Sequence, residues 1–253
     1  MSNLKKYNIF TLCKMRFYSL IIEIIQFILL PILKRQGHSV RESALKLPEA
    51  KGPRFGVKGF GDNLNLLIIG DSSACGVGVN KIEQSLAGFL IENLKTKYKC
   101  NWKIIAQSGL KTHELIKILE NENLTHFEVV VISIGMNDIT SGISREKWLT
   151  SVRILQELLK RKFSVSQLIF SGMPPVDKIK AIPQPLRIFL TLKAKLFDAS
   201  LRIFCLKNQG NNYLSINSSF ELEMFAIDGF HPNEKFYKLW ASMIINKFQH
   251  STK

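Results

Sequence analysis

The sequence predicts an α/β fold in which a central parallel sheet carries helices on both faces. From residue 64 onward, near-continuous apolar runs alternate with segments whose apolar residues recur at helical spacing. Such runs are typical of strands buried on both faces, and strand–helix alternation favours parallel strands joined by right-handed crossovers. The expected strands are 64–69, 102–106, 127–134, 167–170 and a weaker one near 213–216. The expected helices are 82–97, 112–121, 145–162, 187–207 and 233–248.

The composition indicates a folded protein with one main domain. The chain has 253 residues, of which 46% are apolar and 22% charged, so it can bury a substantial core and is not a disordered chain. Its four cysteines form no C-x-x-C pair, which argues against a disulfide framework and a zinc site. The net charge of +15 favours anionic surfaces such as acidic lipid headgroups. Because the basic residues are scattered along the chain, we do not expect nucleic acid as a partner.

The N-terminal segment, residues 1–35, is basic at both ends and apolar between them. Its apolar run over 17–33 is at the short limit for a membrane span, and Glu23 would be costly at the bilayer centre. Ser19, Glu23 and Gln26 fall on one narrow helical stripe. That pattern fits a helix in the membrane interface or a helix packed on the body with one wet edge. A cleaved signal peptide is less favoured, because no small-x-small site follows.

The most informative stretch of the sequence opens the main domain. Residues 36–61 contain several prolines and glycines and are expected to form an extended arm that leads into this domain at 62–250. There the strand expected at 64–69 stops at Gly70 and is followed closely by Ser72. In open α/β sheets, reactive groups collect at the carboxyl ends of strands. The sequence therefore indicates Ser72 as a candidate nucleophile, with a helix-capping serine as the alternative.

Three other stretches supply the groups that a nucleophilic serine needs. A serine hydroxyl reacts when a base takes its proton, and an imidazole base needs an acceptor on its other nitrogen. Asp228 stands three residues before His231, in a loop that precedes the last expected helix. Attack on a carbonyl creates an oxyanion, which needs preorganised donors. The N–H groups of Ser72 and Gly109 and the side-chain amide of Asn137 can supply them from adjacent strand ends.

The sequence resembles the SGNH (GDSL-type) hydrolase family across the main domain. The resemblance is carried by four blocks: Gly70-Asp71-Ser72, Gly109, Gly135-Met136-Asn137-Asp138 and Asp228-Gly229-Phe230-His231. It implies a flavodoxin-like three-layer α/β/α sandwich with a central parallel sheet, to which the N-terminal apolar helix is added. By this resemblance Ser72 is the nucleophile, His231 the base and Asp228 its orienter. Ser72, Gly109 and Asn137 then form the oxyanion hole.

The sequence thus predicts a serine esterase, lipase-like in its chemistry, that cleaves carboxylic (acyl) esters through an acyl-enzyme with neither cofactor nor metal. A sugar O-acetyl esterase or an acyltransferase would use the same site, and a catalytically inert membrane-tethered binding protein is the other alternative. The expected partners are a small-molecule or lipid acyl ester and an anionic membrane surface, contacted through the N-terminal segment. We expect a membrane-associated location, at an inner membrane or cytoplasmic face, with a soluble cytoplasmic protein as the alternative.

Overall fold

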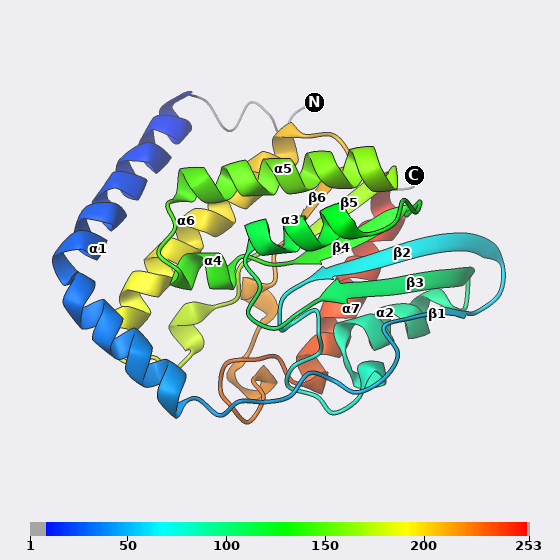
Figure 1. Cartoon of the computed structure of the whole chain (residues 1–253), viewed down its shortest axis with the longest axis horizontal. Helices are drawn as coiled ribbons and strands as arrows, with labels where there is room; N and C mark the ends of the chain where they lie inside the picture. The colour runs from blue at the N-terminus through cyan, green and yellow to red at the C-terminus, as the bar shows by residue number, and fades with distance from the viewer. Residues whose placement is uncertain (1–8, 252–253) are drawn as a thin grey trace.

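A mostly parallel sheet forms the centre of the protein (Figure 1). The computed structural model describes residues 9–251. Within them the sheet has six strands in the order β1-β3-β2-β4-β5-β6, with β1 antiparallel to β3 and every other pair parallel. The strands are β1 (Phe55–Lys58), β2 (Asp62–Gly70), β3 (Tyr98–Ala106), β4 (Val129–Ser133), β5 (Gln167–Ser171) and β6 (Asn211–Leu214). The order of the five parallel strands is that of flavodoxin-like sheets, so the predicted fold class is confirmed.

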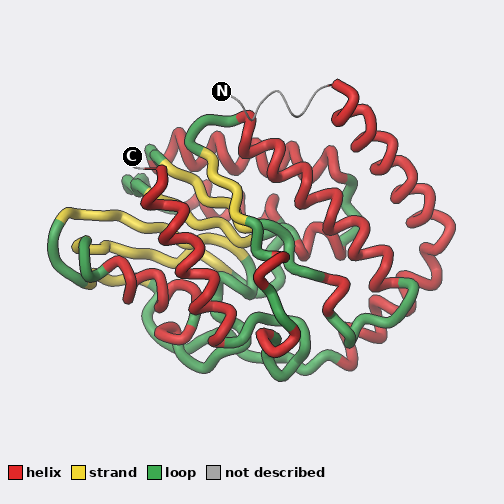
Figure 2. The backbone as a smooth tube through the Cα atoms, turned by 180° about the vertical axis from the view of Figure 1, so that it is seen from behind, coloured by secondary structure: helices red, strands yellow, loops and turns green. Residues whose placement is uncertain are grey.

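Helices cover both faces of this sheet, which makes the three layers visible in Figures 1 and 2. One face carries α2 (Leu86–Leu94) and α7 (Glu234–Ser251), and the other carries α3 (Thr112–Asn121), α5 (Arg145–Phe163) and α6 (Leu186–Lys207). The short α4 (Met136–Thr140) follows β4, and α1 (Ile9–Ser43) packs outside α6. Single 3-10 turns occur at Ile82–Gln84, Val176–Lys178, Asn217–Ser219 and Leu222–Met224.

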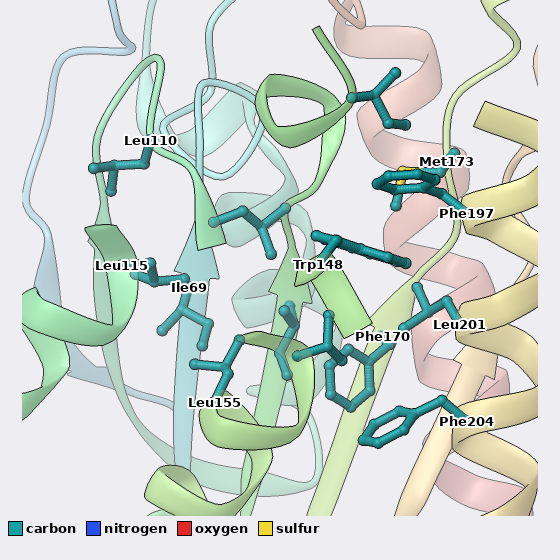
Figure 3. Close-up of a cluster of buried hydrophobic side chains, with 14 of the residues drawn as sticks. Ile69, Leu110, Leu115, Trp148, Leu155, Phe170, Met173, Phe197, Leu201 and Phe204 are labelled. Atoms are coloured by element: carbon teal, nitrogen blue, oxygen red, sulfur yellow. The ribbon is translucent and has the colours of Figure 1, made fainter. Parts of the chain in front are cut away.

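The strands divide the apolar side chains between two cores. Neighbouring residues of β2, Leu67 and Ile68, are both fully buried but point to opposite faces and join different clusters. Figure 3 shows the larger cluster, in which side chains from β2, α3, α5 and α6 meet. At its centre the indole of Trp148 stacks on the ring of Phe197, with 4.6 Å between the ring centroids. This packing fixes the strand ends from which the candidate site residues project.

The expected elements of the main domain are present, with shifted ends and one interruption. The helix expected over 82–97 is divided into a 3-10 turn and α2. The break falls at Ser85, whose side chain is fully buried and accepts a hydrogen bond from the N–H of Gly88. Serine is favoured at a helix N-terminus because its hydroxyl accepts a hydrogen bond from one of the free N–H groups there. The helix α2 therefore begins at the residue after Ser85.

The expected N-terminal helix is present and is longer than predicted. It was expected to end by residue 35, but α1 continues to Ser43. Its second half remains in contact with the body, because Gln36 donates to the carbonyl of Gln184 at 2.7 Å and accepts from the N–H of Leu186 at 3.1 Å. Residues 1–8 of the predicted segment lie outside the described residues.

The stretch expected as an extended arm also contains a strand. Residues 55–58 form β1, which pairs antiparallel with β3 at the edge of the sheet. This strand has only a weak signal in the sequence, because it is short, contains Gly56 and is mostly exposed. The backbone that precedes β1 runs past the carboxyl end of the sheet, where the candidate site lies (Figure 1).

Candidate active site

The candidate site lies where β2 and β4 end side by side. Gly70 is the last residue of β2 and pairs with Ser133, the last residue of β4. A Cβ atom on Gly70 would lie 1.9 Å from the Ser133 carbonyl oxygen, so any other residue would push the two strands apart. The N–H of Asp71 donates to the same carbonyl at 3.1 Å. This close approach fixes the turn that presents Ser72 at the sheet edge.

Ser72, His231 and Asp228 form a continuous hydrogen-bonded chain. His231 Nε2 lies 2.9 Å from Ser72 Oγ, and His231 Nδ1 lies 2.5 Å from Asp228 Oδ2. The other carboxylate oxygen, Oδ1, accepts the N–H groups of Phe230 at 2.9 Å and of His231 at 3.0 Å. A single tight turn therefore fixes the carboxylate relative to the imidazole. The structure brings the three residues together as the sequence predicts.

The three hydrogen-bonded residues differ in their exposure to solvent. The side chain of Asp228 is 1% exposed, whereas that of His231 is 28% exposed and Ser72 is half-buried. Burial alone would raise the pKa of Asp228, but the hydrogen bonds from His231 and from two backbone N–H groups outweigh it and lower this pKa. Asp228 is consequently a carboxylate at neutral pH, and an ester can reach the hydroxyl at the other end.

Two backbone N–H groups near Ser72 have the properties of oxyanion donors. Within the described residues, neither the N–H of Ser72 nor that of Gly109 has a protein acceptor. Gly109 is exposed in the turn after β3 and has a φ of +85°, while a Cβ there would meet nothing within 4 Å. Glycine is thus favoured at this position by its backbone conformation, and not by lack of space.

The third predicted donor, Asn137, is placed on α4 directly after β4. Its Nδ2 donates to Asp71 Oδ2 at 3.2 Å and to the Leu110 carbonyl at 3.1 Å. Both amide protons therefore have protein acceptors, and both of these hydrogen bonds are long. A hydrogen bond from Asn137 to an oxyanion would share or replace one of them.

Two buried carboxylates behind these residues belong to the quoted motif blocks but were assigned no role from the sequence. Asp71 is buried, and this burial raises its pKa to about 7 despite a hydrogen bond from the Ser73 N–H and the proximity of His231. Asp138 is buried as well, and its Oδ2 accepts the N–H and the hydroxyl of Thr112 at 3.0 and 2.8 Å. The only sequence signal was their position next to Ser72 and Asn137. Among the described residues, no group of three or more His, Cys, Asp or Glu side chains is placed to hold a metal ion.

A family model matches this chain over residues 68–239, which contain Ser72, Asn137 and His231. The model is that of the GDSL-like lipase/acylhydrolase family, and it covers more than half of the sequence. The chain belongs to this family. It is therefore a hydrolase of the GDSL (SGNH) type, and the predicted family is confirmed. No curated protein matches the chain.

Solved structures with low sequence identity share this fold. A lipolytic protein of the G-D-S-L family from Veillonella parvula is 16% identical, with a TM-score of 0.59, and the match covers 74% of this chain and 98% of that one. The psychrotrophic esterase EstA from Pseudoalteromonas is 16% identical, with a TM-score of 0.57 and coverage of 75% and 99%. The acetylxylan esterase Axe2 from Geobacillus stearothermophilus is 15% identical, with a TM-score of 0.56 and coverage of 74% and 94%.

Proposed function

We propose that this GDSL hydrolase cleaves acyl esters through a covalent acyl-enzyme on Ser72. The observation that carries the proposal is the hydrogen-bonded chain from Ser72 through His231 to Asp228. In the first half-reaction Ser72 Oγ attacks the ester carbonyl carbon while its proton passes to His231 Nε2. The imidazolium then protonates the leaving alkoxide, which departs as the alcohol. In the second half-reaction His231 Nε2 takes a proton from a water molecule as the water oxygen attacks the acyl carbon. The bond from this carbon to Ser72 Oγ then breaks, the imidazolium returns the proton to Oγ, and the acid leaves.

The negative charge that develops on the carbonyl oxygen requires donors on one side of Ser72. We assign this role to the N–H groups of Ser72 and Gly109 and to the side chain of Asn137. The first two are supported by having no protein acceptor in the described part of the chain, which leaves both protons free for the oxyanion. Asn137 is supported by its place at the neighbouring strand end, and it acts when one of its two long hydrogen bonds gives way.

The experiment that tests this proposal compares wild-type protein with Ser72→Ala on p-nitrophenyl esters of increasing acyl length. We expect turnover by the wild type and background hydrolysis by the folded variant. A fluorophosphonate probe should label Ser72, as the monoethylphosphonate inhibition of the similar Pseudoalteromonas esterase suggests. Turnover that survives in Ser72→Ala would refute the assignment of the nucleophile. No turnover and no labelling in the wild type would favour the inert binding protein instead.

The acyl group and its acceptor need a wider panel. Acetylated xylo-oligosaccharides test a sugar O-acetyl esterase, the activity named for the similar Geobacillus enzyme. Added alcohols test acyl transfer, because an alcohol can replace water in the second half-reaction. We propose a lipid-like acyl ester as the preferred substrate, because the outer surface of α1 is apolar.

That surface is unusual for a helix on a folded domain. The outward side of α1 carries large apolar side chains that are 48–81% exposed: Phe17, Tyr18, Leu20, Ile24, Phe27, Ile28 and Ile32. On its inner side Ser19 is buried, and together with Glu23 and Gln26 it lines a cavity of about 530 Å³ opposite Arg145 and Lys193. A helix of a soluble protein has the reverse distribution, with its apolar side on the core. The stripe predicted as a wet edge is therefore turned partly toward the body, where it faces basic side chains.

We propose that α1 rests in the surface of an anionic membrane with this apolar side in the lipid. By length and composition alone, the segment Cys13–Ser43 could cross a bilayer, because its most apolar 18-residue window has a mean hydropathy of 1.8. However, Met15, Ile22 and Leu33, which lie along the apolar part of the helix, are buried against the domain. A helix packed in this way can span only if the domain enters the bilayer, so an interfacial position fits better. Exposed basic residues adjoin both ends of the apolar side and would meet anionic headgroups: Lys14, Arg16, Lys34 and Arg35.

Co-sedimentation with vesicles tests this attachment. We expect the protein to bind vesicles that contain phosphatidylglycerol and to bind pure phosphatidylcholine vesicles less tightly. Phe27→Glu should release it, whereas Phe60→Glu should not, because both side chains are exposed (81% and 88%) but only Phe27 lies on α1. Equal binding by both variants would refute the proposal. A stable dimer of the wild type that Phe27→Glu dissociates would identify a second copy as the occupant.

A further inference from the structure

The N-terminal arm passes between the two loops that supply the proposed backbone donors. On the side of the Ser72 loop, the N–H of Ala50 donates to the Cys75 carbonyl at 3.2 Å. Lys51 donates to the Asn80 carbonyl at 3.0 Å and accepts from Ile82 at 2.9 Å. This part of the arm is therefore fastened to the segment that follows the nucleophile.

Glu49, the preceding residue, connects the arm to the other loop. Its Oε1 accepts both the N–H and the hydroxyl of Ser108, each at 2.8 Å. Its Oε2 accepts from the Arg54 guanidinium at 2.6 Å, and the Cys75 thiol also hydrogen-bonds to the carboxylate. Burial would raise the pKa of Glu49, but the Ser108 hydrogen bonds and Arg54 lower it, so the group is charged at neutral pH.

The loop that Glu49 contacts has few other restraints. Gln107, Ser108 and Gly109 are all exposed. Two of the other backbone hydrogen bonds of the loop are long, from the Gln107 N–H to Gly70 at 3.4 Å and from the Leu110 N–H to Gln107 at 3.3 Å. The two hydrogen bonds from Ser108 to Glu49 are shorter, at 2.8 Å each, and they end on a charged acceptor. Ser108 shares a peptide unit with Gly109.

We propose that Glu49 is a positioning residue, which holds Ser108 so that the N–H of Gly109 points at the oxyanion. The inference rests on the proposed function. It extends the active site beyond the residues that match the family model, 68–239, into the arm. Glu49 does not touch the substrate in this role, and acts only through the Ser108–Gly109 peptide. Loss of the Glu49 side chain should therefore reduce the stabilisation of the transition state and leave substrate binding nearly unchanged.

The test measures kcat and KM for Glu49→Ala, Glu49→Gln and Ser108→Ala, with Glu92→Ala as the matched control. Glu92 is a glutamate that also forms ion pairs, with Lys58 and Lys95, but it is more exposed than Glu49 and lies away from this loop. We expect kcat to fall about 10- to 100-fold in Glu49→Ala, with KM within about twofold. Glu49→Gln should stay within about fivefold of wild-type kcat, because its amide oxygen can still accept both Ser108 hydrogen bonds. Glu92→Ala should match the wild type.

A boronic acid that mimics the tetrahedral intermediate gives a second readout. Its inhibition constant should rise in Glu49→Ala by the same factor as kcat falls, which a general loss of stability would not cause. Ser108→Ala removes one hydrogen bond from an exposed residue and should lower kcat about threefold. The double variant should be no slower than Glu49→Ala, since both changes break the same contact.

Each contrary outcome is distinct. An unchanged kcat in folded Glu49→Ala, a rise in KM alone, or additive losses in the double variant would overturn the proposal. If Glu49→Ala does not fold, an unchanged kcat in Ser108→Ala overturns it. Wild-type activity that persists in Ser72→Ala overturns the proposed function and this inference together, whereas loss of activity in Ser72→Ala with a normal Glu49→Ala overturns this inference alone.

Discussion

Replacing Asp228 by asparagine should abolish most activity without disturbing the turn that holds His231. The two backbone N–H groups at Oδ1, at 2.9 and 3.0 Å, require an oxygen there, so the asparagine oxygen should occupy this position. Its NH2 group then replaces Oδ2, which lies 2.5 Å from His231 Nδ1. An NH2 group can only donate, so Nδ1 must become the acceptor and the ring proton moves to Nε2.

This tautomer is the wrong one for catalysis. The proton on Nε2 points at Ser72 Oγ across 2.9 Å, so the imidazole can no longer accept the serine proton. In Ser-His-Asp sites an inverted tautomer lowers kcat by about four orders of magnitude, equivalent to about 5.5 kcal/mol of transition-state stabilisation. KM should stay within about threefold, because the Asp228 side chain is 1% exposed and cannot contact the ester.

The assay is steady-state hydrolysis of the best p-nitrophenyl ester, with thermal unfolding measured in parallel. Asp62→Asn, at the opposite end of β2 and exposed, is the control for the same chemical change and should match the wild type. A decrease in kcat of less than tenfold in folded Asp228→Asn would refute the assignment of Asp228 as the residue that orients His231.

Three further changes test other parts of the site. Asn137→Ala should lower kcat about 100-fold or more, as loss of one oxyanion donor does, and near-normal kcat would remove Asn137 from the oxyanion hole. Burial raises the pKa of Asp71 to about 7, above its ordinary 3.8. Between about pH 4 and pH 7 the folded protein therefore keeps a proton on Asp71 that the unfolded chain has lost, so the free energy of unfolding falls as the pH rises through this range. Asp71→Asn should flatten this decrease by up to about 4 kcal/mol in denaturant titrations across that range, and an unchanged slope would contradict the prediction. Gly70→Ala should destabilise the protein by more than about 3 kcal/mol, because its Cβ would lie 1.9 Å from the Ser133 oxygen, and wild-type thermal stability would refute that close approach.

The sequence was most informative where local pattern and tertiary position coincide. The strands at the centre of the sheet are apolar on both faces, so β2 and β4 could be recognised from their apolar runs alone. Ser72 and Asn137 follow these strands closely, so the sheet determines where they lie. Asp228 and His231 are three residues apart, so one turn sufficed to predict their contact.

Contacts between distant segments could not be predicted in this way. Glu49 lies 59 residues from Ser108 in a stretch rich in proline and glycine, and no motif in the adjacent sequence identifies it as a site residue. The polar stripe of α1 was visible in the sequence, but periodicity does not tell which side of a helix meets the body. That side depends on the basic residues of α5 and α6 that Glu23 and Gln26 face across the cavity.

Each of two proposed oxyanion donors depends on a nearby carboxylate, and the pKa values of these two carboxylates are shifted in opposite directions. Glu49, which contacts the loop of Gly109, is partly exposed, and its pKa is lowered, so it keeps its charge at neutral pH. Asp71, which accepts from Asn137, is buried, and its pKa of about 7 means that it titrates near neutral pH. Ionisation of Asp71 makes it a stronger acceptor and ties Asn137 more firmly, whereas protonation weakens that hydrogen bond and frees the amide for the oxyanion. The pH sensitivity of the oxyanion hole should therefore come from the Asn137 side, while the Gly109 side stays constant.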